Sequence, residues 1–242
     1  MEKASSHHFM TQVSVCVLIP AYNEEKEIGC VIEAVQQRGF AVVAVDDGST
    51  DKTALAIQNS GAQCVISAVN EGKGAALRKG LQWVIQSPYQ AVIVMDADGQ
   101  HLPDDLDLFM QALESSGVDL VIGNRMHDPK GMPFIRRCTN RVMSGVISLI
   151  TRQSVPDTQC GYRALTRRVF ENIELRTHRF EIESEMILSA CHKGLRIQSI
   201  PISSVYQNET SHIRPFLDTF RFFRFIFQFI FFHRRSRMLT RT

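Results

Sequence analysis

Two aspartates and a glutamine stand at alternate positions directly after a short apolar segment. The segment is 91–95, and Asp96, Asp98 and Gln100 follow it. Alternate residues of an extended chain point to the same side, so these three side chains can present their oxygen atoms together. Oxygen ligands suit a hard cation such as Mg²⁺ or Mn²⁺, which in turn binds phosphate. The competing interpretation is a solvated turn, because Asp and Gly are common turn residues.

Other apolar segments also end in polar residues. Asp46 and Asp47 follow the apolar segment 40–45, and the polar residues 22–25 come soon after the apolar segment 13–19. Capping of the helix that follows explains part of the polar segment that begins at Asp46, but capping does not need the two adjacent carboxylates of Asp46 and Asp47. Carboxylates at the end of a buried strand are costly unless they bind something, so they indicate a nucleoside hydroxyl, a base edge or a metal as partner.

The elements that must position these residues alternate along the chain. Apolar strand patterns and helical patterns follow one another from residue 13 to about residue 120, which is typical of βα units around a mainly parallel sheet. Open α/β sheets bind ligands at the carboxyl ends of their strands, where the acidic residues are expected. We predict strands at 13–19, 40–46, 63–66, 91–95, 118–122, 160–165 and 195–206. We predict helices at 24–37, 50–60, 73–86, 103–115, 134–151, 167–172 and 181–192.

Length and composition limit the class of protein. With 242 residues and 44% hydrophobic content, the chain can bury the core of one α/β domain. The six cysteines form no Cys-x-x-Cys pair, which favours reduced thiols in the cytosol over disulfides or a zinc site. Residues 1–12 form a polar tail without the apolar centre of a signal peptide.

A glycine-rich segment offers a further phosphate site. In 70–76 the glycines leave backbone N–H groups open, and Lys73 stands among them at the start of a predicted helix. The segment lacks the spacing of a Walker loop, and no dinucleotide-binding G-x-G-x-x-G follows a strand. By itself such a turn is more often an ordinary helix start.

Five motifs taken in order resemble those of glycosyltransferase family 2. They are Pro20–Glu24, Asp46–Asp51, Asn70–Gly74, Asp96–Gln100 and Asp157–Arg163, and the resemblance covers about residues 13–215. Within the family, the chain is most similar to the dolichyl-phosphate mannose synthases and the bacterial polyprenyl-phosphate glycosyltransferases.

This resemblance implies a GT-A fold, an α/β architecture with a Rossmann-like sheet flanked by helices. It implies an inverting, metal-dependent enzyme that moves a hexose from a nucleotide-sugar of the GDP-mannose or UDP-glucose type to a polyprenyl or dolichyl phosphate. By position, Asp96, Asp98 and Gln100 would bind Mg²⁺ or Mn²⁺. The donor nucleotide-sugar would be bound by Pro20, Tyr22, Glu24, Asp47 and Lys73.

Arginines supply the cations that phosphate chemistry requires. Arg125 follows the predicted strand 118–122, where the family places a phosphate-binding arginine, and we expect it to act in catalysis with the metal aspartates. Arg137 and Arg141 lie four residues apart, on one helix face, and with Arg214 they are candidates for the acceptor phosphate. The alternative is that the arginines of 134–151 only solvate the outer face of that helix.

A lipid phosphate is already ionised near neutral pH, so no general base is required.

The last residues are both aromatic and basic. From residue 213 onward there are seven arginines and one aspartate, in a chain with a formal net charge of +2. We predict a catalytic domain over 13–214 and a helix and tail over 215–242 that lies in the headgroup region of a membrane. It is too interrupted to span a bilayer, which takes about 20 apolar residues. We therefore expect a peripheral protein, bound to the cytoplasmic face of the membrane through this helix. The alternative is a helix packed on the domain or across a homo-oligomer.

Other classes fit less well. No nucleic-acid-binding motif accompanies the basic residues. A sugar nucleotidyltransferase should carry a glycine- and arginine-rich activation loop, which Pro20–Glu24 does not match. A non-catalytic nucleotide-sugar-binding subunit is expected to lose a metal carboxylate, whereas this chain keeps both. A glycosyltransferase with a non-lipid acceptor stays open.

Overall fold

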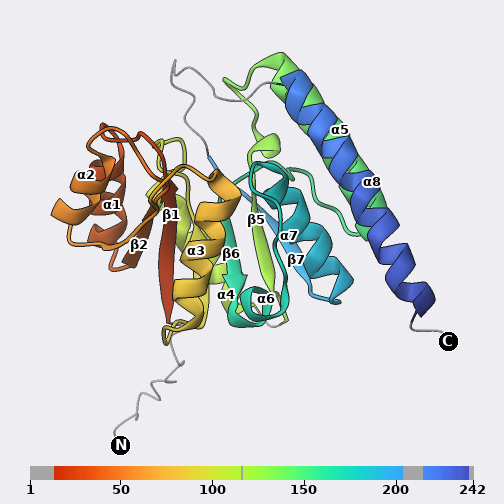
Figure 1. Cartoon of the computed structure of the whole chain (residues 1–242), viewed down its shortest axis with the longest axis horizontal. Coiled ribbons are helices and arrows are strands. Elements are labelled where there is room, and N and C mark those ends of the chain that lie inside the picture. The colour runs from red at the N-terminus through yellow and green to blue at the C-terminus, as the bar shows by residue number, and fades with distance from the viewer. Residues whose placement is uncertain (1–13, 116, 204–214, 240–242) are drawn as a thin grey trace, which may run out of the picture.

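One seven-stranded sheet organises the chain in the computed structural model (Figure 1). The structure describes residues 14–115, 117–203 and 215–239, and of 215–218 and 232–239 it describes only the backbone. The strand order is β3-β2-β1-β4-β6-β5-β7. The strands are β1 (Val15–Ala21), β2 (Ala41–Asp46), β3 (Gln63–Ile66), β4 (Ala91–Val94), β5 (Leu120–Asn124), β6 (Arg163–Thr166) and β7 (Ile197–Pro201).

The sheet is mainly parallel, as predicted. β1 pairs in parallel with β2 and β4, with Ala21 opposite Asp46 and Leu18 opposite Val94. Only β6 runs against its neighbours, and it lies between β4 and β5. The carboxyl ends of β1, β2, β4 and β5 therefore meet at one edge of the sheet, together with the amino end of β6. We call this edge the rim.

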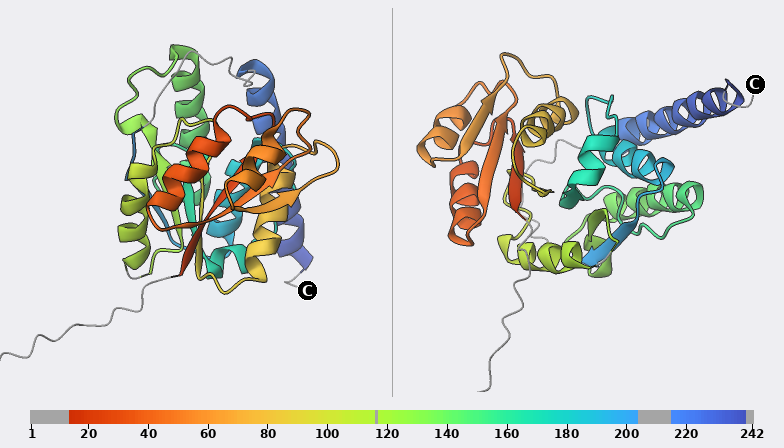
Figure 2. Two further views of the ribbon diagram at one scale, coloured as in Figure 1. Left: turned by 90° about the vertical axis from the view of Figure 1, so that its left-hand side faces the viewer. Right: turned by 90° about the horizontal axis from the view of Figure 1, so that it is seen from below.

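Helices cover both faces of the sheet (Figures 1 and 2). α1 and α4 lie on one face, and α3, α6 and α7 lie on the other. Apolar residues three or four apart explain the packing: in α1, residues 28, 31, 32 and 35 are buried. The helices are α1 (Ile28–Gln37), α2 (Thr53–Asn59), α3 (Lys73–Ile85), α4 (Leu106–Glu114), α5 (Phe134–Thr151), α6 (Arg167–Asn172), α7 (Glu181–His192) and α8 (Pro215–Leu239), with short 3-10 helices at Pro103–Asp105 and Arg125–His127.

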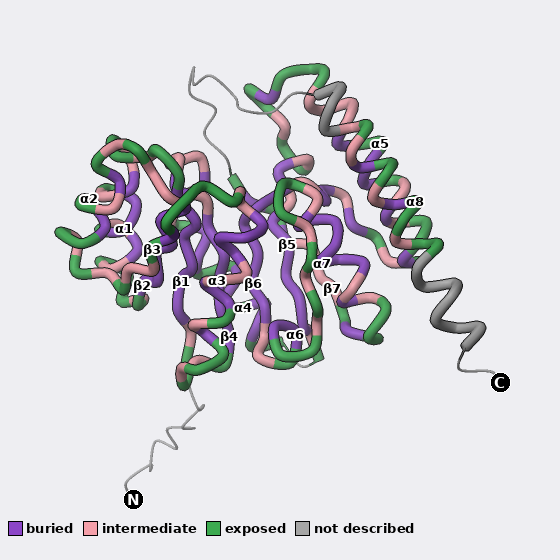
Figure 3. The backbone as a smooth tube through the Cα atoms, viewed as in Figure 1, coloured by how far each residue is buried: buried purple, intermediate pink, exposed green. Residues whose placement is uncertain are grey.

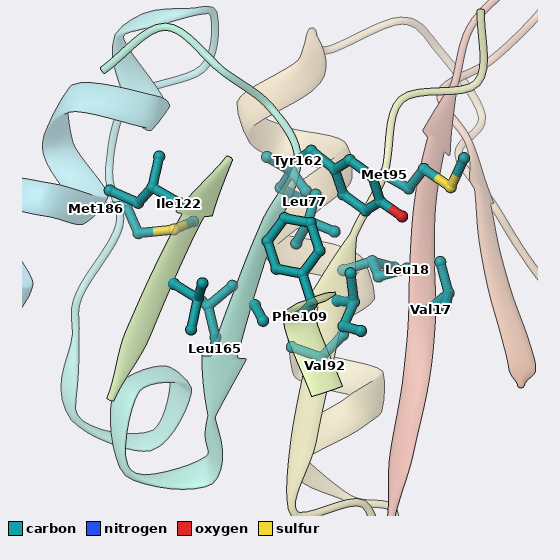
Figure 4. Packing of buried hydrophobic residues seen from close by; sticks show 14 of the residues in the cluster. Val17, Leu18, Leu77, Val92, Met95, Phe109, Ile122, Tyr162, Leu165 and Met186 are labelled. Atoms are coloured by element: carbon teal, nitrogen blue, oxygen red, sulfur yellow. The ribbon is translucent and has the colours of Figure 1, made fainter. Parts of the chain in front are cut away.

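The core lies between the sheet and these helices and reaches the rim. Figure 4 shows Tyr162 beside Met95 and above Phe109. The Tyr162 and Phe109 rings are 4.4 Å apart, and neither side chain is exposed. This packing fixes the segment before β6 against the end of β4, which is where the acidic residues follow.

The C-terminal helix packs on the domain with one side only. α8 contacts α5 and α7 (Figure 1), and its Phe222 and Ile226 are buried in the core. Phe227 and Phe231 are about two-thirds exposed. The helix is therefore partly a core element, which the sequence left open. Within the described residues, no helix is long and apolar enough to cross a membrane.

Candidate active site

Lys73 is held between two carboxylates at the rim, one of which is Asp96. Lys73, the first residue of α3, places its Nζ 2.7 Å from Asp96 Oδ1 and 2.9 Å from Glu183 Oε1. Burial alone would lower the pKa of Lys73, but the two carboxylates raise it above its usual range. Burial opposes ionisation of Asp96, yet the Lys73 ammonium holds the pKa of that carboxyl below its usual range. Both groups are therefore charged at neutral pH.

His101 also positions Asp96, although the sequence did not single it out. The Asp96 backbone N–H donates to His101 Nδ1 at 3.1 Å, so the neutral ring carries its proton on Nε2, which lies 3.8 Å from Asp96 Oδ2. The His101 ring stacks on Tyr162 with centroids 4.8 Å apart. Burial lowers the pKa of His101 to about 4, so the imidazole is neutral near pH 7. No local pattern distinguishes this histidine from an ordinary turn residue.

Gly161 lies against the same ion pair. A Cβ on Gly161 would be 2.6 Å from Asp96 Oδ2, 2.7 Å from Asp96 Oδ1 and 2.9 Å from Lys73 Nζ. No larger residue fits without moving the ion pair. The Asp157–Arg163 motif thus includes a glycine that contacts the predicted metal aspartate.

Asp98 and Gln100 form a turn beside Asp96. Asp98 Oδ1 accepts a hydrogen bond from the Gln100 backbone N–H at 3.0 Å, and Gly99 between them has a φ of +72°. Among the described residues, no three His, Cys, Asp or Glu side chains are grouped to enclose a metal. Mg²⁺ commonly takes one or two protein carboxylates and completes its shell with water and substrate phosphate, a requirement that Asp96 and Asp98 can meet. Their metal role, and that of Gln100, stays a prediction.

The loops after β1 and β2 are bound to each other beside this turn. Asn23 has a φ of +56°, its backbone N–H donates to Ser49 Oγ at 2.9 Å, and its Oδ1 accepts from the Thr50 N–H. Asp47 accepts hydrogen bonds from the backbone N–H groups of Glu71 and Gly72. Burial raises the pKa of Asp47 despite these bonds. Asp47 thereby connects the second acidic segment to the glycine-rich segment.

The predicted nucleotide residues occupy this side of the rim. Pro20 is buried in β1, Tyr22 is 41% exposed, and the Glu24 backbone N–H donates to Thr53 Oγ1 at 2.7 Å. Tyr22 has the exposure that stacking on a base requires, and Asp47 has a structural task in addition to any ligand. Contact of these residues with a nucleotide stays a prediction.

Arg125 is held by a buried carboxylate. Its Nε and Nη2 lie 2.9 and 3.0 Å from the Asp157 oxygens, and its backbone N–H donates to the same group. Asn140 of α5 donates to Asp157 Oδ1 at 2.7 Å. Burial alone would raise the pKa of Asp157, but the Arg125 guanidinium holds it below its usual range. The guanidinium is thereby fixed near the rim, and its phosphate role stays a prediction.

Arg163 has a structural role through main-chain atoms. Its guanidinium is fully buried and donates to the carbonyl oxygens of Cys160, Thr158 and Glu183. These bonds connect the segment before β6 to the first turn of α7.

The acceptor candidates lie along α5. Arg137 is half-buried, its Nε has no hydrogen-bond partner among the described residues, and its guanidinium lies 5.6 Å from the centre of the Phe134 ring. Arg141 is exposed. Arg214, the third candidate, lies outside the described residues. The roles of all three stay predictions.

Comparison with known proteins identifies relatives of one family. The model described as Glycosyl transferase family 2 matches residues 16–174. Glycosyltransferase AglJ of Haloferax volcanii is 36% identical over 194 residues, which cover 79% of this chain and 63% of the relative. The UDP-N-acetylglucosamine–dolichyl-phosphate N-acetylglucosaminyltransferase of Methanococcus voltae is 29% identical over 220 residues, covering 81% and 88%. The polyprenol monophosphomannose synthase of Mycolicibacterium smegmatis is 29% identical over 204 residues, covering 77% and 76%.

A solved structure supports the fold. Glucosyl-3-phosphoglycerate synthase from Mycobacterium tuberculosis, in complex with Mn²⁺, uridine diphosphate and glucosyl-3-phosphoglycerate, superposes with a TM-score of 0.67. The two chains are 20% identical, and the match covers 83% of this chain and 74% of the other. The predicted GT-A-like α/β architecture is confirmed.

Proposed function

We propose that this chain, which belongs to glycosyl transferase family 2, moves a hexose from a nucleotide-sugar to a polyprenyl or dolichyl phosphate with inversion. That the chain is a glycosyltransferase follows from its family and from relatives named for that activity. The lipid phosphate is supported by relatives whose names include dolichyl-phosphate and polyprenol. GDP-mannose and UDP-glucose are the donor types we expect.

The observation that carries the proposal is the charged group at the rim. Asp96 is held in place by Lys73 and His101, and Arg125 is fixed beside it by Asp157. With Asp98, Asp96 would hold Mg²⁺ or Mn²⁺, which stabilises the developing negative charge of the leaving diphosphate. Arg125 would bind a phosphate oxygen on the side away from the metal. Preorganised charges of this kind lower the barrier to transfer because they need no rearrangement during the reaction.

The acceptor side follows from the chemistry of the nucleophile. An ionised phosphate oxygen needs no proton removed, so the protein must place it in line with the anomeric carbon and screen it from the donor phosphates. Arg137 and Arg141 on α5, with Arg214, would provide that screening. The Arg137 Nε–H has an unmet hydrogen-bonding capacity, which supports a role for this residue in binding an anion.

Contact with a membrane surface would bring the lipid acceptor to the rim. α5 and α8 lie side by side (Figure 1) and both carry exposed residues on the outside of the molecule (Figure 3). Among the side chains that the structure describes, the exposed large apolar ones of the two helices are Phe134, Ile135, Val142, Leu149, Ile150, Phe220, Phe223, Phe227, Ile230 and Phe231. An apolar surface flanked by arginines suits anionic lipid headgroups. The free thiols of all six cysteines support the cytoplasmic face.

A donor and acceptor screen tests the function. Nucleotide-sugars are offered with a short polyprenyl phosphate or with 3-phosphoglycerate, and nucleoside diphosphate release and the glycosylated product are measured. The proposal expects a lipid-phosphate glycoside that forms only with added Mg²⁺ or Mn²⁺. Transfer to 3-phosphoglycerate alone would replace the lipid acceptor with a soluble one, and transfer in the presence of a chelator would contradict the metal requirement.

Membrane contact is tested by sedimentation with anionic vesicles. Phe227→Ser combined with Phe231→Ser should release the protein from phosphatidylserine vesicles and leave its melting temperature unchanged, because both side chains are exposed. Phe222→Ala is the matched control, since this buried phenylalanine should cost about 3–5 kcal/mol of stability. A double variant that sediments like the wild type would place the membrane contact elsewhere.

A further inference from the structure

The carboxylate predicted to bind a divalent cation already has a cation of the protein beside it. Lys73 Nζ lies 2.7 Å from Asp96 Oδ1, and both side chains are mostly buried. Gly161 borders this ion pair, and a Cβ at its position would lie 2.6 and 2.7 Å from the two Asp96 oxygens and 2.9 Å from the ammonium. A divalent ion bound to Asp96 would therefore be within a few ångströms of the ammonium. Like charges repel at that distance, and a charge of +2 doubles the effect.

Glu183 gives the ammonium a second acceptor. Its Oε1 is 2.9 Å from Lys73 Nζ, and its side chain is only 5% exposed. Its other oxygen, Oε2, is buried without a hydrogen-bond partner among the described residues. A buried carboxylate oxygen without a partner is unfavourable, so Glu183 gains if the ammonium moves further onto it. The first turn of α7 favours a negative charge there in either state.

The two partners of Lys73 differ in exposure. Asp96 is 25% exposed at the rim, where a ligand can reach it, whereas Glu183 is enclosed behind it. The ring of Phe180 lies 5.9 Å from Nζ and borders the same space. Lysine has a flexible four-carbon stem, so a shift of its ammonium between two neighbouring carboxylates needs only side-chain rotation.

We propose that Lys73 is an exchangeable counter-ion of Asp96, which leaves Asp96 for Glu183 when a divalent cation binds. The inference rests on the proposed metal-dependent function and adds a second role to Lys73 and a receiving role to Glu183. Without metal, the ammonium neutralises Asp96 and keeps its carboxylate in position. With metal, the ammonium is held by Glu183 and stays near the donor phosphates. The exchange weakens the binding of metal alone and so favours its arrival with the nucleotide-sugar, which supplies further oxygen ligands.

Mn²⁺ binding by the full chain without nucleotide tests the exchange. Free Mn²⁺ is measured by electron paramagnetic resonance during titration of the wild type and of Lys73→Met. Because the variant has no ammonium to displace, its Kd should fall at least tenfold. Mn²⁺ should also raise the melting temperature of the variant more than that of the wild type. Lys79→Met is the matched control: Lys79 lies on the same helix and pairs with Glu71, away from Asp96, so the Kd should not change.

A second variant tests the receiving role. Glu183→Gln should raise the Kd for Mn²⁺ severalfold, because the ammonium then has only Asp96 as a charged partner. In the Lys73→Met background the same change should have a much smaller effect, which separates displacement of the ammonium from simple loss of a nearby negative charge. Glu183→Gln also keeps the inference testable if Lys73→Met does not fold.

The outcomes separate this inference from the proposed function. An unchanged Kd in folded Lys73→Met, or equal effects of Glu183→Gln in both backgrounds, would overturn the exchange and leave metal-dependent transfer standing. Absence of Mn²⁺ binding at millimolar concentration in the wild type and in every variant would overturn the metal site as well.

Discussion

Gly161→Ala should impair transfer much more than it impairs folding. The added methyl group would be 2.6 and 2.7 Å from the two Asp96 oxygens and 2.9 Å from Lys73 Nζ. Because both oxygens are too close, rotation of the carboxylate cannot relieve the contact, and the ion pair must move by roughly 0.5–1 Å. Gly161 has no positive φ, so its backbone accepts alanine and the effect comes from this contact alone.

The expected magnitudes follow from that displacement. Overpacking of this kind costs about 1–3 kcal/mol, and each kcal/mol lowers the melting temperature by about 2–4 °C in a chain of this size. A misplacement of about 1 Å at a catalytic group costs up to about a hundredfold in rate, so we expect kcat/KM to fall roughly ten- to hundredfold. Scanning calorimetry and initial-rate assays measure the two effects.

A second glycine provides the control. A Cβ on Gly145, in the middle of α5, meets nothing within 4 Å. Gly145→Ala should therefore leave kcat/KM unchanged and stabilise the helix by about 1 kcal/mol. If Gly161→Ala has the kcat/KM of the wild type, the reasoning that places Asp96 in the reaction is refuted.

Further substitutions test other parts of the site. Asp98→Asn should abolish transfer with an unchanged circular dichroism spectrum, since it removes charge and hardly any volume; full activity in chelator-treated buffer would contradict the metal assignment. Asp157→Asn should cost about 3–5 kcal/mol in urea denaturation, because it leaves a buried guanidinium without its carboxylate, whereas the same change at the exposed Asp128 should have no measurable effect. The pKa of Asp157 is lower in the folded state than in the unfolded state. The ionised carboxylate therefore contributes its full stabilisation above the unfolded pKa of about 4, and this stabilisation is lost as the pH falls through the folded-state pKa. In that acidic range the free energy of unfolding should fall less in Asp157→Asn than in the wild type. Arg137→Ala or Arg141→Ala should raise the KM for lipid phosphate without changing donor affinity by calorimetry, and equal losses toward both substrates would indicate a folding defect.

Local pattern predicted most of the elements. The helices predicted at 134–151, 167–172 and 181–192 have those bounds in α5, α6 and α7. Their apolar spacing and flanking turns determine where they begin and end. Strand bounds are less well predicted: the strand expected at 160–165 is β6, Arg163–Thr166, because pairing with β4 and β5 determines its length. Its antiparallel direction comes from tertiary arrangement, which no local pattern indicates.

The sequence indicated the acidic and basic residues of the candidate site, but it did not indicate the residues that contact them. The alternation of Asp96, Asp98 and Gln100 located one part of the rim, and the resemblance located others. Glu183 lies in the first turn of α7, where a negative charge is favourable in any helix, so the sequence gives no sign of its contact with Lys73. His101 is only five residues from Asp96, but its ring also stacks on Tyr162, which is 61 residues away and reaches it only through packing. Contacts between distant segments carry this information, and sequence spacing does not.

The place of β6 in the sheet affects how the protein is assembled during synthesis. A nascent chain that has left the ribosome as far as β4 already contains Lys73 and can pair β1 with its neighbours, but the β4 edge of the sheet is still open. β6 fills that edge later, and the residues just before it bring Gly161 to the acidic end of β4; Glu183 follows with α7. The group formed by Asp96, Lys73, Gly161 and Glu183 is therefore complete only after the part of the sheet predicted to bind the nucleotide has formed. Truncated chains that end before β6 should expose the unpaired edge of β4, and we expect them to aggregate rather than accumulate as half-active enzyme.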